Sequence, residues 1–125
     1  MSIDHPSPLG GKRILIVEDE MLLAMDLESI LEGWGAEVLG PAPNIDKALD
    51  VLSRDRPDAA TLDMNLNGDS SSPLAGELST RNIPFVVISG YSASNADLSE
   101  FQEAQVIGKP FDRQELLSAM LDILS

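Results

Sequence analysis

Residues 13–20 read RILIVEDE, a run of apolar residues that stops abruptly at three acidic ones. A continuous apolar run of this length is typical of a β-strand covered on both faces, as in a parallel sheet. The predicted strand Ala59–Leu62 runs into Asp63, and another predicted strand ends just before Lys109. The loops beyond the carboxyl ends of parallel strands form the binding crevice of an open sheet. The sequence therefore predicts that carboxylates and one ammonium group meet at one sheet edge.

The rest of the chain alternates further apolar runs with segments of helical spacing. Residues 20–34 place apolar side chains at helical intervals, and Gly35 suits the position just beyond a helix end. Residues 65–73 are rich in Asn, Gly, Ser and Asp and predict a loop. Five strands alternating with five helices predict an α/β domain with a parallel sheet. The remaining predicted strands are Ala36–Leu39, Phe85–Ile88 and Gln105–Ile107, and the remaining predicted helices are Asn44–Ser53, Leu74–Arg81, Asn95–Glu103 and Asp112–Leu124.

The composition indicates a single acidic domain. A chain of 125 residues is the size of one domain, and its formal net charge of -13 is unusually negative. Because such a surface repels phosphates and anionic lipid, we expect no nucleic-acid or membrane binding. The chain has no cysteine, which excludes disulfides and thiolate metal sites and fits a cytoplasmic location. We expect residues 1–11 to be a flexible tail, residues 12–125 to form the domain, and no output domain to follow.

The residues at the predicted sheet edge suit a divalent cation and a phosphoryl group. Like charges as close as Glu18, Asp19 and Asp63 raise one another's pKa unless a cation lies between them. A hard ion such as Mg²⁺ relieves this repulsion by binding one or two carboxylates while keeping several waters. A carboxylate at Asp63 can attack phosphorus to form an acyl phosphate, and Lys109 can pair with phosphate oxygens. Ser89, after the fourth strand, can donate a hydrogen bond to another phosphate oxygen.

Each of these residues alone is ordinary on a protein surface, and the signal lies in their conjunction. From about Lys12 to Ser125 the chain resembles a receiver domain of a bacterial two-component response regulator. The resemblance implies a flavodoxin-like (βα)5 three-layer sandwich with a five-stranded parallel sheet in the order 2-1-3-4-5. The motifs that carry it are Glu18-Asp19 after the first strand, Asp63 after the third, Ser89-Gly90 after the fourth and Lys109-Pro110-Phe111 after the fifth.

The resemblance also implies how such a site works. Asp63 would accept a phosphoryl group from a phosphohistidine on a sensor histidine kinase or a histidine phosphotransfer protein. Glu18, Asp19 and Asp63 would hold Mg²⁺ together with the backbone carbonyl of Asn65. The protein would catalyse its own phosphorylation and dephosphorylation without being a conventional enzyme. It would act through protein contacts, as a monomer or weak dimer, with a docking face on the fourth and fifth helices.

Lys109 and Ser89 would contact the phosphoryl group. In this family the lysine binds the phosphate, and the bond between Lys109 and Pro110 is usually cis, which the low cost of cis X–Pro bonds permits. Ser89 would move toward the phosphate as the switch hydroxyl. Phosphorylation would then bias an existing equilibrium between two arrangements of the fourth helix, the fifth strand and their loops.

The chain departs from the family pattern at the switch. Most receivers carry an aromatic residue three positions before the lysine, where this chain has Val106. The segment Ser89-Gly90-Tyr91 resembles a receiver subgroup known mostly from alphaproteobacteria, and Tyr91 either replaces the missing relay or is a loop aromatic without a switching role. The chain resembles a stand-alone member of the family.

Two other function classes compete with this interpretation. A pseudo-receiver would use the same fold as a phosphorylation-independent protein-binding module, and Val106 keeps that alternative open. A phosphatase of the haloacid dehalogenase type also uses a strand-end Asp and Mg²⁺, but it needs a second Asp two residues later. Asn65 stands at that position and argues against the phosphatase.

Overall fold

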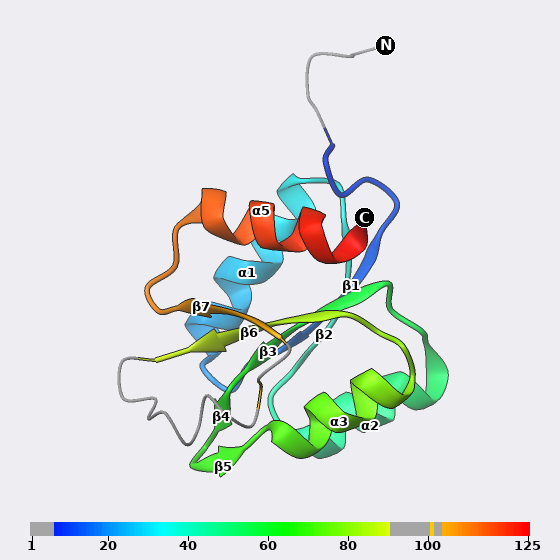
Figure 1. Cartoon of the computed structure of the whole chain (residues 1–125), viewed down its shortest axis with the longest axis vertical. Coiled ribbons are helices and arrows are strands. Elements are labelled where there is room, and N and C mark those ends of the chain that lie inside the picture. The colour runs from blue at the N-terminus through cyan, green and yellow to red at the C-terminus, as the bar shows by residue number, and fades with distance from the viewer. Residues whose placement is uncertain (1–6, 91–100, 102–103) are drawn as a thin grey trace.

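The computed structural model of the protein describes residues 7–90, 101 and 104–125, and its centre is an open parallel β-sheet (Figure 1). The strand order is β2-β1-β3-β6-β7, and every pair of neighbours is parallel. This is the predicted flavodoxin-like order 2-1-3-4-5, because β6 and β7 are the fourth and fifth strands of the sheet. The strands are β1 (Arg13–Val17), β2 (Glu37–Ala42), β3 (Ala59–Asp63), β6 (Phe85–Ser89) and β7 (Gln105–Gly108).

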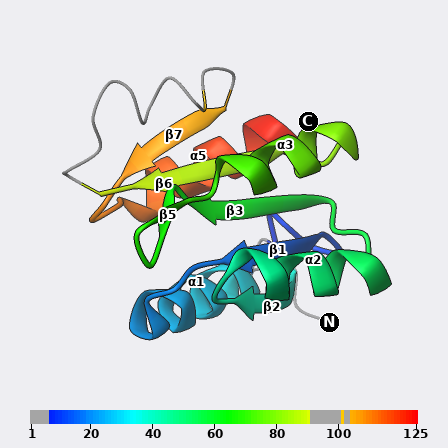
Figure 2. The ribbon, with the colours of Figure 1, turned by 90° about the horizontal axis from the view of Figure 1, so that it is seen from below.

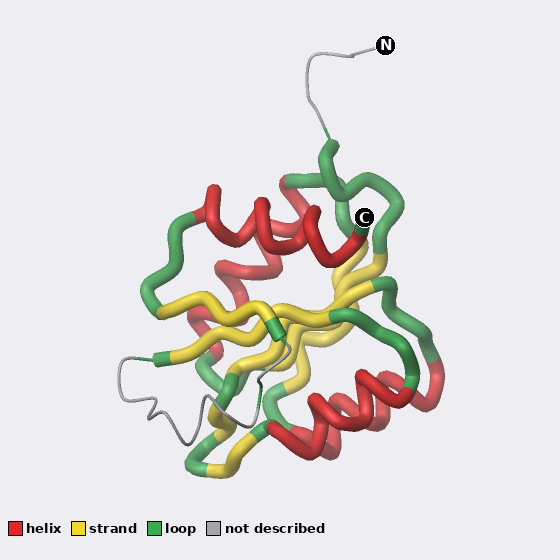
Figure 3. The backbone as a smooth tube through the Cα atoms, in the orientation of Figure 1, coloured by secondary structure: helices red, strands yellow, loops and turns green. Residues whose placement is uncertain are grey.

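Helices cover both faces of the sheet. They are α1 (Met21–Gly33), α2 (Ile45–Arg54), α3 (Ser72–Thr80) and α5 (Arg113–Leu124). Helices α1 and α5 lie on one face and α2 and α3 on the other, which gives the three predicted layers (Figures 2 and 3). One apolar cluster joins Leu27 of α1 to Leu116 of α5, and a second joins Leu52 of α2 to Leu78 of α3. The central strands β1, β3 and β6 are thus buried on both faces, as their largely apolar sequences require.

The segment before β1 is packed against the fold. Leu9 is fully buried in the cluster beneath α1 and α5, and its backbone N–H donates to the Trp34 carbonyl at 2.9 Å. Gly35 (φ +95°) permits this close approach, because a Cβ there would lie 2.9 Å from the Cβ of Ser7. The expectation of a flexible tail over residues 1–11 is therefore wrong for residues 7–11, and residues 1–6 lie outside the described part of the chain.

The second strand is longer than predicted. The predicted strand Ala36–Leu39 stops before Gly40 and Pro41, yet β2 continues through both to Ala42. β2 lies at the edge of the sheet, and Pro41 has no partner in the register with β1, which shifts between Leu15 and Val17, so the missing N–H of Pro41 is tolerated. The Gly40–Pro41 peptide is cis, and Gly40 has φ +89°.

The predicted loop at residues 65–73 holds regular structure. A short antiparallel hairpin pairs β4 (Asn65–Leu66) with β5 (Asp69–Ser70), and α3 begins at Ser72, two residues earlier than predicted. The two residues between the hairpin strands, Asn67 (φ 55°) and Gly68 (φ 90°), both adopt positive φ. An Asn-Gly pair suits such a tight two-residue turn, since both residues tolerate this backbone conformation.

The predicted fourth helix, Asn95–Glu103, lies outside the described residues except for Phe101, which is buried in the cluster with α2 and α3. Tyr91 also lies outside them. Among the helices that are described, none combines the length and the apolar character needed to cross a bilayer.

Candidate phosphoryl-acceptor and metal site

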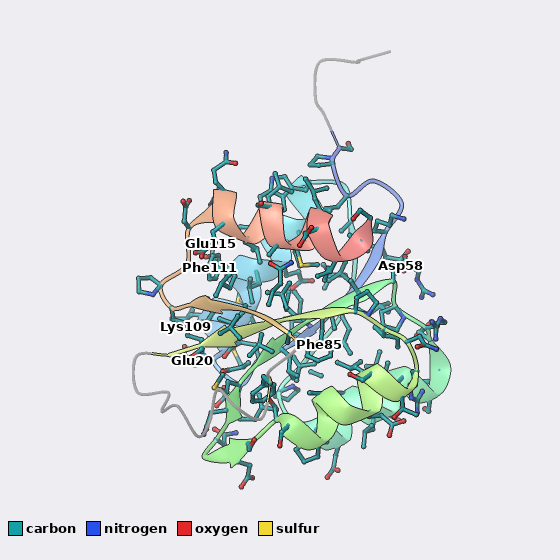
Figure 4. All side chains as sticks on the ribbon, viewed as in Figure 1. Glu20, Asp58, Phe85, Lys109, Phe111 and Glu115 are labelled. Carbon is teal, nitrogen blue, oxygen red and sulfur yellow. The ribbon has the colours of Figure 1, made fainter. Side chains whose placement is uncertain are left out.

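The carboxyl ends of the parallel strands bring the predicted site residues together. Glu18 and Asp19 follow β1, Asp63 ends β3, and Lys109 follows β7. One oxygen from each of the three acids lies within 4.8 Å of the others. Lys109 and the neighbouring Glu20 lie at this end of the sheet in Figure 4, opposite the end that carries Asp58.

Asp63 is held at the centre of the site. Its side chain is buried, and its two oxygens have different partners. Oδ2 accepts a hydrogen bond from the Lys109 ammonium at 3.0 Å, and Oδ1 accepts one from the Asn65 backbone N–H at 3.2 Å. β3 is the central strand of the sheet, and it is paired with β1 on one side and β6 on the other. The backbone that carries this carboxylate is therefore held in place.

Glu18 is the most deeply buried acid of the site. It is 2% exposed, its Oε2 accepts from the Glu20 backbone N–H at 3.0 Å, and its buried Oε1 has no hydrogen-bond partner among the described residues. Burial and the interaction with Asp63 raise the pKa of Glu18 from 4.5 to about 8, although the hydrogen bond from the Glu20 N–H and the attraction of Lys109 lower it. Oε1 lies 3.5 Å from the Lys109 Nζ, close enough for charge attraction but without a hydrogen bond.

Lys109 is surrounded by carboxylates. Its ammonium lies 3.0 Å from Asp63, 3.5 Å from Glu18 and 4.0 Å from Glu20. Burial lowers the pKa of Lys109, but the hydrogen bond to Asp63 and the surrounding charges outweigh burial and leave the pKa above its ordinary value. The bond between Lys109 and Pro110 is cis, as the family resemblance implied.

The acidic cluster suits a hard divalent cation. Three carboxylates converge, and one of their oxygens, Oε1 of Glu18, is buried without a hydrogen-bond donor. Mg²⁺ prefers oxygen ligands and binds through one or two carboxylates, so this donor set fits Mg²⁺. Asn65 lies directly beside the cluster, since its N–H donates to Asp63.

Of the predicted switch residues, the structure describes Ser89, Gly90 and Val106, and Ser89 lies at the end of β6, the strand next to the one that ends at Asp63. Ser89 ends β6, is 5% exposed, and donates from its hydroxyl to the Gly90 carbonyl at 3.1 Å. Its own carbonyl accepts from the Lys109 N–H at 2.7 Å, which ties β6 to the lysine loop. Val106 on β7 is 37% exposed, so it forms no buried relay in this structure.

Sequence reasoning missed two contributors to the site. Glu20 was noted as part of the acidic run but given no role, although it is one of three acids near Lys109. The backbone N–H of Asn67 donates to Oδ2 of Asp19 at 2.9 Å. The Asn67-Gly68 pair was a signal for a tight turn, but its contact with Asp19, which is 48 residues away, could not be read from the sequence.

Comparison with known proteins identifies the class. The family model described as "Response regulator receiver domain" matches residues 14–121. The chain therefore belongs to this family, the receiver domains of two-component response regulators.

Individual relatives cover the chain to different extents. SdrG from Sphingomonas melonis Fr1, known from a solution structure, is 38% identical with a TM-score of 0.78, over 91% of this chain and 97% of SdrG. The phyllosphere-induced regulator PhyR of Methylorubrum extorquens is 37% identical, over 78% of this chain and 38% of PhyR. Sporulation initiation phosphotransferase F of Bacillus subtilis is 26% identical, over 88% of this chain and 91% of that protein. The chain spans about half the length, or less, of several curated relatives it matches.

Proposed function

We propose that this receiver domain accepts a phosphoryl group on Asp63 in a Mg²⁺-dependent reaction. The observation that carries the proposal is the contact between Asp63 and Lys109 at 3.0 Å, beside a cluster of carboxylates suited to a cation. This arrangement supports a site in which Asp63 is the nucleophile, Lys109 binds the phosphate and the neighbouring acids hold the cation. The donor would be a phosphohistidine on a sensor histidine kinase or a histidine phosphotransfer protein.

The transfer needs only positioning and charge neutralisation. A carboxylate oxygen of Asp63 attacks phosphorus as the bond to the donor's imidazole nitrogen breaks, and that nitrogen keeps the bonding electrons. The product is an acyl phosphate on Asp63, which water later hydrolyses to aspartate and inorganic phosphate. Mg²⁺, held by Glu18, Asp19, Asp63 and the Asn65 carbonyl, would supply positive charge at the phosphoryl oxygens. Lys109 pairs with one of those oxygens and gives up its contact with Asp63.

Phosphorylation would move the switch residues. Ser89 donates to the neighbouring Gly90 carbonyl, and in the phosphorylated protein its hydroxyl would donate to the phosphoryl group instead. That change would shift the loop after β6, where Tyr91 is a candidate relay in place of Val106. The exposed position of Val106 supports a relay that does not use this residue.

The relatives support phosphotransfer within a signalling chain. One of them is named a phosphotransferase, and similarity to SdrG and PhyR favours the subgroup with the Ser89-Gly90-Tyr91 segment. We propose a cytoplasmic protein that is a monomer or weak dimer. It would act as a phosphorelay intermediate, a phosphate sink or a direct effector.

The test is the intact mass of the protein after incubation with Mg²⁺ and acetyl phosphate, with Asp63→Asn alongside. The expected result is the gain of one phosphoryl group by the wild type only. No gain by the wild type, in acetyl phosphate and with a panel of sensor kinases, would favour the pseudo-receiver. That alternative draws its support from the missing aromatic at Val106.

A further inference from the structure

We propose that the tight turn of the β4–β5 hairpin, Asn67-Gly68, is a positioning element that holds Asp19 in place for the cation. The inference rests on the proposed Mg²⁺ site and adds an element to it. In this view the affinity for Mg²⁺ depends on a backbone turn that contributes no ligand of its own.

Two backbone amides of the hairpin hold two of the three site acids. The N–H of Asn67 donates to Oδ2 of Asp19 at 2.9 Å, and the N–H of Asn65 donates to Oδ1 of Asp63 at 3.2 Å. A hydrogen bond to a carboxylate is stronger than one between neutral groups. The hairpin therefore joins the end of β1 to the end of β3 across the site.

The hairpin is firmly anchored on its other side. The Gly68 N–H donates to the side-chain oxygen of Asn65 at 2.7 Å, which closes the turn. Leu66 is 3% exposed in the cluster with α2 and α3. After β5, the N–H and the hydroxyl of the fully buried Ser71 both donate to the Met64 carbonyl at 3.0 Å. The Asn67 amide that donates to Asp19 therefore belongs to a hairpin that is held by hydrogen bonds and by a buried side chain.

This arrangement favours cation binding for two reasons. A carboxylate has two oxygens, so the bond from Asn67 to one of them leaves the second to offer a cation. Because the side chain of Asp19 is already oriented, binding a cation costs less conformational entropy. The amide dipole also reduces repulsion among Asp19, Glu18 and Asp63 before the cation arrives. Partners that orient metal ligands typically change metal affinity by roughly tenfold or more when they are lost.

Two glycines offer a matched pair for the test. Gly68 (φ +90°) and Gly11 (φ +78°) both have positive φ, and a Cβ on either would meet nothing within 4 Å. Val strains the backbone at both positions, but only Gly68 belongs to the turn that holds Asp19. Gly68→Asn is the conservative variant, because Asn tolerates positive φ better than a β-branched residue.

The readouts are the Kd for Mg²⁺ by isothermal titration and the exchange rate of the Asn67 amide by NMR in Mg²⁺-free buffer. We expect Gly68→Val to weaken Mg²⁺ binding by roughly tenfold and to speed exchange of that amide. Gly11→Val should keep the wild-type Kd, and Gly68→Asn should restore most of the affinity. Equal Kd values for Gly68→Val and the wild type, or equal weakening by both Val variants, would overturn the positioning role.

The outcome is separable from that of the proposed function. If the wild type gains a phosphoryl group but the two Val variants bind Mg²⁺ equally, only the positioning role falls. If Gly68→Val alone weakens Mg²⁺ binding but the wild type gains no phosphoryl group, the positioning role holds and phosphoryl acceptance fails. A wild type that binds no Mg²⁺ overturns the positioning role as well.

Discussion

Replacing Glu18 with Gln should stabilise the cation-free protein at neutral pH. The carboxyl is 2% exposed, and burial next to Asp63 raises its pKa to about 8, against 4.5 in an unfolded chain. Between these two values the folded protein holds a proton that the unfolded chain releases. The free energy of unfolding therefore falls as pH rises from about 4.5 to about 8 and levels off above the folded-state pKa.

The magnitude follows from the linkage between proton binding and folding. One proton changes the free energy of unfolding by about 1.4 kcal/mol per pH unit. From pH 4.5 to pH 7 the cost carried by Glu18 reaches an upper bound of about 3 kcal/mol. Gln keeps the size of the side chain and an oxygen for the Glu20 N–H, and its NH₂ can donate to Asp63. It therefore removes the titration without opening a cavity.

Urea unfolding at pH 5 and pH 7 in EDTA measures the effect. The difference in stability between Glu18→Gln and the wild type should increase in favour of the variant by about 2 to 3 kcal/mol between these pH values. Glu20→Gln is the control, since it makes the same substitution at a side chain of the same rim that is 64% exposed. Parallel pH profiles for Glu18→Gln and the wild type would refute the reasoning.

Three further substitutions test other parts of the fold by the same unfolding assay. Thr61→Val should raise the free energy of unfolding by about 1 kcal/mol, because the buried Thr61 hydroxyl has no hydrogen-bond partner among the described residues; a loss would show that the hydroxyl is paired. Leu9→Ala should lower it by about 2 to 4 kcal/mol, since Leu9 is fully buried, and no change would mean that the segment before β1 is not packed. Gly40→Ala should destabilise strongly, because its Cβ would lie 2.7 Å from the Ala42 nitrogen; wild-type stability would exclude this close approach.

The parts of the fold with strong local signals were predictable. Continuous apolar runs located β1 and β6, because strands covered on both faces favour apolar residues at successive positions. Asn44 was predicted to begin a helix and does so, with its side chain accepting from the Lys47 N–H at 2.8 Å. The acids and the lysine at the strand ends were found because each apolar run stops at a charge.

The rest depended on tertiary contacts. Leu9 is a single apolar residue without periodicity, so nothing local marks it as buried. Pro41 ends a strand by local rules, but the edge position of β2 tolerates it. The two-residue strands of the hairpin are too short for an alternating pattern, and the bond from Asn67 to Asp19 exists only because the fold brings two distant loops together.

The most direct test of phosphoryl acceptance is to locate the phosphoryl group on the chain. After incubation with acetyl phosphate and Mg²⁺, borohydride reduces an acyl phosphate on aspartate to homoserine, and peptide mass spectrometry identifies the altered position. We predict conversion at Asp63 alone, with none in EDTA. An unaltered Asp63 in the presence of Mg²⁺, or conversion at another acid, would contradict the assignment of Asp63 as the phosphoryl acceptor.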